Sequence, residues 1–156
     1  MSLATELIVG KDYGYVLIAA AGTFILSTWH GMRVTGYRKK AGIKYPQAYA
    51  EKSDMNAASA EKKEAMHLFN CAQRAHGNYL ENMPTASIAL LVSGLAYPKT
   101  AAVMGAGWLV SRVLFAIGYT NPSKQDGKGR LIGSGFWLFQ LGLIGLTGYS
   151  GVKLLL

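Results

Sequence analysis

The chain contains a single cysteine, Cys71, so no disulfide can form within it. Only 15% of its 156 residues are charged, against about 25% in a typical soluble domain. Acidic residues are the scarcer kind, since 8 Asp and Glu accompany 16 Lys and Arg and leave a formal net charge of +8. With 51% hydrophobic residues, this composition favours a membrane protein over a soluble one.

Several kinds of site are missing from the sequence. The basic residues fall in loops between apolar runs without interleaved aromatics, which argues against nucleic acid as a partner. His30, His67 and His76 have no metal-ligand spacing with carboxylates or with Cys71, so no metal site is predicted. There is also no glycine-rich phosphate loop and no hydrolase triad. Anionic lipid and an anionic substrate remain as partners for the positive charge.

Apolar stretches long enough to cross roughly 30 Å of hydrocarbon dominate what is present. The expected helices cover about 12–36, 66–97, 100–120 and 131–154. The prediction is therefore one all-α integral membrane domain over residues 1–156, a bundle of four transmembrane helices per protomer. The second helix is too long for one crossing at ~1.5 Å per residue, so its first half should leave the membrane or be buried among other helices. Pro84 should kink this helix without ending it.

Small residues within the apolar stretches predict close helix packing. The last span carries glycines at intervals of three, at Gly142, Gly145, Gly148 and Gly151. Such residues let the backbones of membrane helices approach each other, and Gly22 and Gly31 predict the same for the first span. Gln140 is the one polar side chain in the middle of the last span, where a structural role is expected.

Loop charge predicts the orientation of the bundle. Residues 33–66 hold eight Lys and Arg, and the loop before the last span adds Lys124, Lys128 and Arg130. The second loop holds only Lys99. Positive charge stays on the cytosolic side, so the first and third loops should be cytosolic and both termini should lie on the far side.

The strongest functional signal is a polar stripe in the second expected helix. Asn70, Arg74, Asn78 and Glu81 follow spacings of four, four and three, which places them on one helix face. A membrane helix carries such residues toward protein or a water-filled cavity, because lipid offers them no partners. The orientation above brings this stripe to the cytosolic end, together with Arg112 of the third span.

The side chains of this region suit a small zwitterionic peptide. Arg74 and Arg112 are planar forks for carboxylates, Glu81 accepts from an ammonium group, and Asn78 pairs with a peptide unit. Arg130, expected to open the fourth helix, would add its charge to the helix N-terminus and stabilise a thiolate. Glutathione, with two carboxylates, one amine and one thiol, is such a ligand. A shift of about two units in its thiol pKa needs roughly 2.7 kcal/mol, which is within reach of one partly desolvated arginine.

Structural alternatives stay open for each of these residues. Arg74 and Glu81 could form an ion pair that only satisfies their own charges, and Arg112 could pair with Glu81 across the bundle. His76 lies on another side of the helix and could be a core histidine. Cys71 is expected to behave as a small buried hydrophobe.

The run Phe69–Glu81, Phe-Asn-Cys-Ala-Gln-Arg-Ala-His-Gly-Asn-Tyr-Leu-Glu, closely resembles the signature of the MAPEG family of membrane proteins in eicosanoid and glutathione metabolism. Its opening Phe-Asn-Cys is similar to the type-3 microsomal glutathione transferases. Further matching segments extend the resemblance over nearly the whole chain: Arg38-Lys39-Lys40, Tyr45-Pro46, Tyr97-Pro98, Arg112-Val113-Leu114, Gly118-Tyr119 and Pro122-Ser123-Lys124.

The resemblance implies a homotrimer in the endoplasmic reticulum membrane, or in the mitochondrial outer membrane, with the site facing the cytosol. Glutathione, as cosubstrate, would lie between adjacent protomers, with Arg38 reaching it from the neighbouring protomer. Arg130 would be the catalytic residue that stabilises the thiolate. Phe115 stands where the family commonly has tyrosine, so one hydroxyl contact is expected to be missing. With Arg112 added from its chemistry, the expected glutathione-binding residues are Arg38, Arg74, His76, Asn78, Glu81, Arg112 and Tyr119.

The leading interpretation is a membrane glutathione transferase that acts on lipophilic electrophiles, including leukotriene C synthase-type conjugation, with glutathione peroxidase activity toward lipid hydroperoxides. The alternative is a non-catalytic lipid-binding or scaffold member of the same family, in which the charges only hold the helices together. A transporter or channel is disfavoured because the polar residues cluster at one end and line no path across the bilayer.

Overall fold

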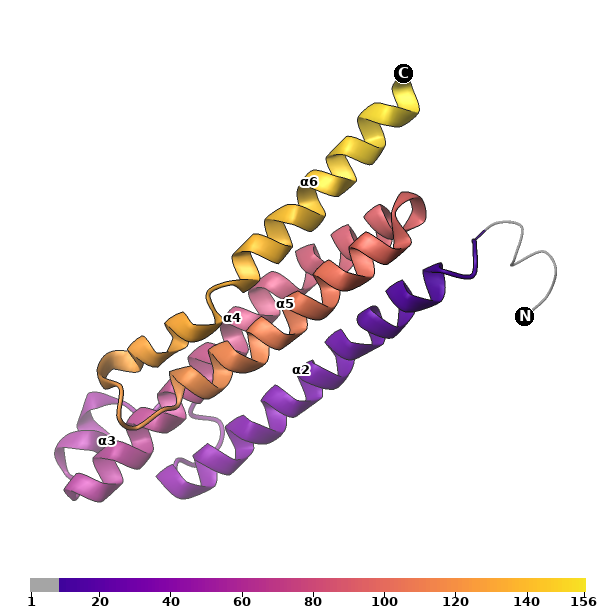
Figure 1. Cartoon of the computed structure of the whole chain (residues 1–156). Coiled ribbons are helices and arrows are strands. Elements are labelled where there is room, and N and C mark those ends of the chain that lie inside the picture. The colour runs from indigo at the N-terminus through magenta and orange to yellow at the C-terminus, as the bar shows by residue number, and fades with distance from the viewer. Residues whose placement is uncertain (1–8) are drawn as a thin grey trace. The chain divides into compact units, whose positions relative to one another are not determined.

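The computed structural model describes residues 9–156, and within that range every regular element is a helix. In chain order the elements are α2 (Tyr13–Ala41), α3 (Lys52–Asn56), α4 (Ala60–Ala96), α5 (Pro98–Tyr119), the 3-10 helix η1 (Gln125–Gly133) and α6 (Phe136–Leu155) (Figure 1). Of these, α2, α5 and α6 are long and apolar enough to cross a membrane. The all-α membrane architecture is confirmed, whereas α4 is not among these spans, so the count of four spans stays a prediction.

Helix α2 runs to Ala41, beyond the expected end at 36. Its last turn consists of Arg38, Lys39 and Lys40, which the sequence placed in a loop. Cations in the last turn interact favourably with the helix C-terminus, so the basic run extends the helix. The helix stops at Gly42, whose φ of 69° suits a glycine and whose N–H donates to the Arg38 carbonyl at 2.9 Å.

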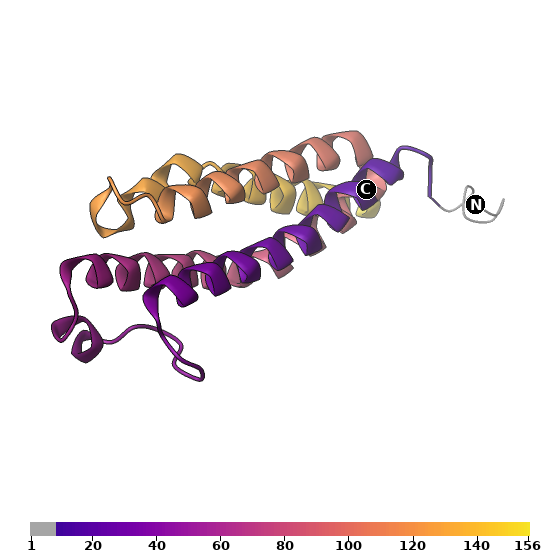
Figure 2. The same cartoon turned by 90° about the horizontal axis from the view of Figure 1, so that it is seen from below.

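Helix α4 begins at Ala60, six residues before the expected start. Ser59 precedes it in the position of a capping residue and accepts a hydrogen bond from the Lys62 N–H through its Oγ at 3.4 Å. The helix continues through Pro84 to Ala96, so the prediction that this proline does not end it is confirmed. The loop before it, with the short α3, lies side by side with the beginning of α4 in Figures 1 and 2.

The prediction that the last span begins at residue 131 is wrong. Residues up to Gly133 belong to η1, and α6 begins only at Phe136. The left-handed residues Asp126 (φ 54°) and Gly127 (φ 65°) lie near the beginning of η1 and bend the chain there. Arg130 therefore lies in η1 and does not open the fourth helix. The expected addition of its charge to the N-terminal dipole of that helix is corrected accordingly.

Contacts divide the chain into two units, which are described separately. The first unit contains residues 9–25, 82–111 and 135–156. Its core is built from Val16, Ala19, Ala20, Ala89, Leu90, Ala101 and Leu143. Within this unit Gln140 accepts from Trp108 Nε1 at 3.0 Å and donates to Asn82 Oδ1 at 3.2 Å, which fits the structural role expected for it.

The glycine predictions have a mixed outcome. A Cβ on Gly22 would lie 2.6 Å from the Leu109 side chain, so a neighbouring helix does approach there. Around Gly31, Gly145, Gly148 and Gly151 no described atom lies within 4 Å of such a Cβ. Within the described chain no neighbouring helix approaches these four glycines, and their packing against a helix of another protomer stays a prediction.

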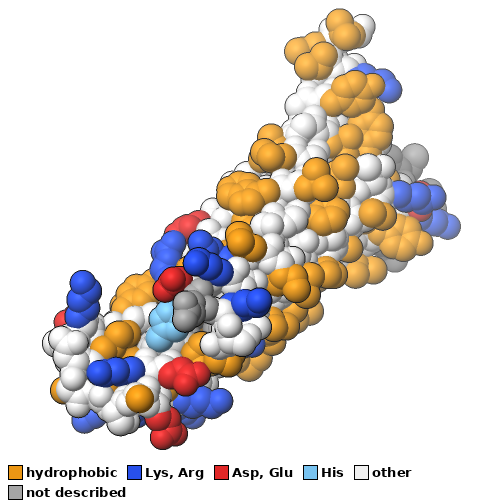
Figure 3. Space-filling view, turned by 60° about the vertical axis from the view of Figure 1, so that its left-hand side comes forward, with side chains coloured by type: hydrophobic (Ala, Val, Ile, Leu, Met, Phe, Trp, Pro, Cys, Tyr) orange, Lys and Arg blue, Asp and Glu red, His pale blue; other side chains and the backbone are white. Residues whose placement is uncertain are grey.

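The second unit contains residues 26–81 and 112–134. Its core is formed by Val34, Ala41, Ile43, Ala50, Met66, Phe69 and Ala72. Charged side chains gather around α3 and the beginning of α4 in Figure 3. Every predicted site residue belongs to this unit, so its contacts can be followed within one body.

Candidate functional site

A chain of polar contacts joins α4 to α5. We define the polar cluster as Arg74, Asn78, Glu81 and Arg112. Arg112 Nη1 donates to Asn78 Oδ1 at 2.9 Å, and Asn78 Nδ2 donates to Glu81 Oε2 at 3.3 Å. Arg74 Nη1 lies 3.8 Å from Glu81 Oε1. The predicted helix face is thus confirmed for its last three members, which meet one another and an arginine from the next helix.

Arg112 forms the buried end of the polar cluster, with 0% of its surface exposed. Its guanidinium lies 4.8 Å from the centre of the Phe115 ring and 5.6 Å from that of Tyr79. A buried charge is stable only with hydrogen bonds and close partners, which Asn78 and these rings provide. In the described chain Arg112 therefore supports the site through Asn78, and its direct contact with glutathione stays a prediction.

Arg74 and Glu81 form the open end of the cluster. Their side chains are 52% and 57% exposed, and an ion pair of this kind contributes little to stability. A ligand can therefore open this ion pair, with its own carboxylate binding Arg74 and its ammonium group binding Glu81. Tyr49, from the loop before α3, lies beside Arg74 and raises the pKa of this arginine. Tyr49 was missed in the sequence because it comes from a loop without a motif.

Arg130 approaches the same region from η1. Its guanidinium lies 5.3 Å from the centre of the Tyr119 ring, and Tyr119 meets Phe115 edge to face with 5.6 Å between ring centres. Arg130 Nη1 donates to the carbonyls of Gly127 at 3.0 Å and Asp126 at 3.3 Å. Since arginine has five N–H donors, these bonds orient the side chain and leave donor capacity for an anion.

Glycines allow η1 to pack directly on α5. The backbones of Gly118 and Gly129 approach so closely that a Cβ on either would overlap the carbonyl oxygen of the other. A Cβ on Gly127 would overlap the Tyr119 ring. These contacts position Arg130, and no helix periodicity would have revealed them.

Arg38 lies apart from the polar cluster in the second hydrophobic core. It is buried, with its guanidinium 4.3 Å from the Tyr45 ring centre and 4.7 Å from that of Phe69. Its Nη1 donates to the Gln47 carbonyl at 2.6 Å. These contacts fold the loop after α2 onto α4. A contact of Arg38 with a ligand of a neighbouring protomer stays a prediction.

His76 stacks on His30, with 5.8 Å between ring centres, and His30 stacks on Tyr79 at 4.7 Å. These are packing contacts, in line with the core-histidine alternative. The Tyr79 ring in turn lies 5.6 Å from the Arg112 guanidinium, so the stack reaches the polar cluster through this ring. A polar contact of His76 with glutathione stays a prediction.

Asn70, the first residue of the predicted stripe, has a structural task. Its Nδ2 donates to the Ala50 carbonyl at 2.9 Å, and its Oδ1 accepts from the Ala50 N–H at 2.8 Å. The amide thus completes both backbone hydrogen bonds of one loop residue. The expectation that Asn70 shares in the site is corrected accordingly.

Asn70→Ala is expected to destabilise the protein by about 1–3 kcal/mol, because the backbone groups of the buried Ala50 lose both partners. Thermal unfolding in detergent measures the change. Asn56→Ala, on the exposed end of α3, is the control and should leave the midpoint unchanged. Equal midpoints for the two variants would contradict the structural task given to Asn70.

Cys71 is buried on α4, and its Sγ lies 3.5 Å from His67 Nε2. Burial raises the pKa of the Cys71 thiol, which opposes formation of a nucleophilic thiolate. The expectation of a small buried residue is confirmed. A thiol reaction at this site would have to use the sulfur of a bound molecule.

An all-helical chain with apolar spans and a buried arginine linked to an open ion pair is an integral membrane protein with a polar site. The sequence model of the MAPEG family matches residues 16–149, which include all the predicted site residues. The chain therefore belongs to the MAPEG family, a membrane family that includes glutathione transferases and related members.

Proposed function

We propose that this protein is a membrane glutathione transferase, which ionises the thiol of bound glutathione for attack on lipophilic electrophiles. The observation that carries the proposal is the polar cluster, in which a buried arginine, an amide and an open Arg–Glu pair are connected in series. If Arg74 and Glu81 only neutralised each other, their link through Asn78 to the buried Arg112 would have no purpose. The scaffold alternative treats the same contacts as purely structural.

Each group has a definite task in the proposed binding. Arg74 binds a glutathione carboxylate, and Glu81 accepts from its ammonium group, so the ligand replaces the 3.8 Å ion pair with two complementary ones. Asn78, held at one side by Arg112, pairs with a peptide unit of the ligand. The ligand therefore gains charge-assisted hydrogen bonds on an already ordered helix face.

Arg130 completes the proposed chemistry. The thiol proton leaves to water and the guanidinium stabilises the thiolate. The sulfur then bonds to the electrophilic carbon while another bond of that carbon breaks: an epoxide opens to an alkoxide that takes a proton from water, or a halide leaves as its anion. The Tyr119 ring packs against the Arg130 guanidinium and holds it in place. In the proposal the Tyr119 hydroxyl contacts the ligand. In the proposed peroxidase activity the thiolate attacks the terminal oxygen of a lipid hydroperoxide, the O–O bond breaks, and the lipid leaves as its alcohol after taking a proton from water. The glutathione sulfenic acid formed in this step then reacts with a second glutathione to give glutathione disulfide and water.

The proposal includes an assembly and a location. Arg38 would contact glutathione from a neighbouring protomer, and His76 would add a polar contact, in a homotrimer whose sites face the cytosol from the endoplasmic reticulum membrane. The mitochondrial outer membrane is the alternative location. The open glycine face of α6 supports an assembly, because small residues favour helix contacts in membranes. The type-3 microsomal subfamily belongs to this same proposal.

Titration calorimetry in detergent tests the binding step. The protein is expected to bind glutathione saturably, and Arg74→Gln or Glu81→Gln should each weaken Kd by about tenfold, the lower range for hydrogen bonds to charged groups. Lys63→Gln is the control for Arg74→Gln, since it removes one charge from an exposed position of the same helix. An absence of saturable binding would favour the scaffold alternative. Equal affinities of the Arg74 and Lys63 variants for glutathione would show that the polar cluster is not the glutathione site.

A further inference from the structure

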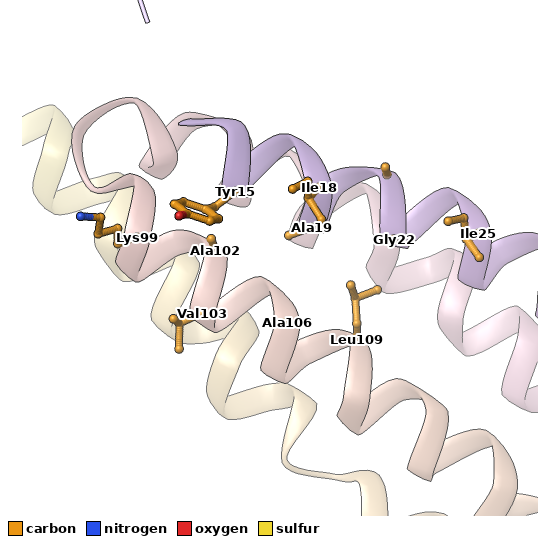
Figure 4. A pocket seen from close by; sticks show the side chains of 11 residues that line it. Tyr15, Ile18, Ala19, Gly22, Ile25, Lys99, Ala102, Val103, Ala106 and Leu109 are labelled. Carbon is orange, nitrogen blue, oxygen red and sulfur yellow. The ribbon is translucent and has the colours of Figure 1, made fainter. Parts of the chain in front are cut away.

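A groove of about 880 Å³ lies between α2 and α5 in the first contact unit (Figure 4). Its volume falls within the roughly 300–1,000 Å³ range of small-molecule sites. Lys99 and the Tyr15 hydroxyl are its only polar side-chain groups, and the other lining residues, all described, are glycine or apolar. None of these residues belongs to the polar cluster.

Small residues form the floor of the groove and large ones form its edges. Ala19 and Ala102 lie between Ile18 and Val103, which are each 71% exposed. The lining residues run from Tyr15 to Ile25 on α2 and from Lys99 to Leu109 on α5, about three turns of each helix, so a linear apolar chain can follow the groove along both helices.

The direction of the groove matches that of a lipid in a bilayer. In Figure 4 Tyr15 and Lys99 lie together at one end, and Leu109 lies toward the other. Lys99 is the second residue of α5, and Leu109 follows ten positions later, ~15 Å along the helix. Leu109 packs on Gly22 and narrows the groove at that point. The polar end thus lies at a helix terminus, where headgroups lie, and the apolar part follows the span.

Both signs of charge are present at the polar end. Lys99 Nζ lies 3.1 Å from Asp12 Oδ2, and the two side chains are 73% and 48% exposed. Such an exposed pair is weak and can be opened by competing charges. A zwitterionic phospholipid headgroup carries a phosphate for the lysine and an ammonium group for the aspartate.

We propose that this groove holds an acyl chain of a zwitterionic membrane phospholipid, with its phosphate beside Lys99 and its ammonium group beside Asp12. The chain fills the space over Ala102 and Ala106, and the headgroup remains at the membrane surface. The proposal is independent of glutathione, because it uses other residues and involves no reaction.

Native mass spectrometry of protein released from phosphatidylcholine nanodiscs tests the proposal. Wild-type protein is expected to retain phosphatidylcholine. Ala106→Phe places a ring in the groove and should lower the retained fraction by about tenfold, as expected for overfilling a shaped site. Lys99→Gln should lower it by about fivefold, the effect of one cationic contact at a membrane surface. In nanodiscs that also contain phosphatidylglycerol, Asp12→Asn should shift the retained lipid toward phosphatidylglycerol, because the ammonium group of phosphatidylcholine loses its partner.

Val152→Phe on α6 is the matched control, since it adds the same ring at an exposed apolar position outside the groove. Thermal unfolding verifies that both aromatic variants are folded, and Lys99→Gln tests the site without adding bulk. If wild-type protein released from the nanodiscs retains no phosphatidylcholine, the proposal is overturned. Equal retention by the Ala106 and Val152 variants would do the same.

Discussion

Arg130→Ala is expected to lower the conjugation rate at saturating glutathione by roughly 25-fold at pH 7 and to leave the affinity for glutathione within a factor of about three. The magnitude follows from ionisation: a thiol held near pKa 6.5 is mostly thiolate at pH 7, whereas one at 8.5 is only a few per cent thiolate. The difference should nearly vanish at pH 9, where both thiols are ionised. Ultraviolet difference absorbance of the thiolate, recorded against pH, measures the shift directly.

Lys128→Ala is the control for this experiment, because it removes one positive charge from the same short helix at an exposed position. Its rate should match that of the unmodified protein. An Arg130→Ala variant with the original thiolate absorbance would show that another donor stabilises the sulfur. A rate loss that stays constant up to pH 9 would assign Arg130 a task other than thiol ionisation.

The sequence predicted those parts of the site that depend on helix periodicity. Arg74, Asn78 and Glu81 recur at spacings of four and three, so any helix over this segment brings them together. Arg112 was recognised because a charge inside an apolar span needs a polar partner, and the structure supplies Asn78 as that partner. Each of these two inferences needs the sequence of only one helix.

What the sequence could not predict depends on contacts between distant segments. Asn70 has the right spacing for the site, yet its amide is occupied by the backbone of Ala50, twenty residues earlier. Tyr49 lies in a loop and reaches Arg74 only after that loop folds onto α4. Arg130 was assigned to the start of a helix because an apolar run follows it, whereas it lies in η1, which two left-handed residues bend near its beginning. Periodicity carries no information about such turns.

The close contact between η1 and α5 leads to a second large effect. Gly129→Ala is expected to reduce conjugation as strongly as Arg130→Ala, because the new Cβ would overlap the Gly118 carbonyl oxygen. Backbone atoms cannot give way as a flexible side chain can, so η1 must move off α5 and carry Arg130 away from Tyr119. The polar cluster lies on α4 and α5, so glutathione should still bind, with an affinity within a factor of about three of the original.

A double-variant cycle identifies the cause of this loss. If Gly129 acts only by positioning Arg130, the Gly129→Ala/Arg130→Ala protein should be no slower than either single variant, since coupled residues are not additive. Gly36→Ala is the control, because no described atom lies within 4 Å of its added Cβ and alanine favours a helix interior by roughly 0.5–1 kcal/mol. Calorimetry with glutathione separates a displaced loop from an unfolded protein. Additive losses in the double variant would mean that the loop contributes more to the reaction than the placement of one arginine.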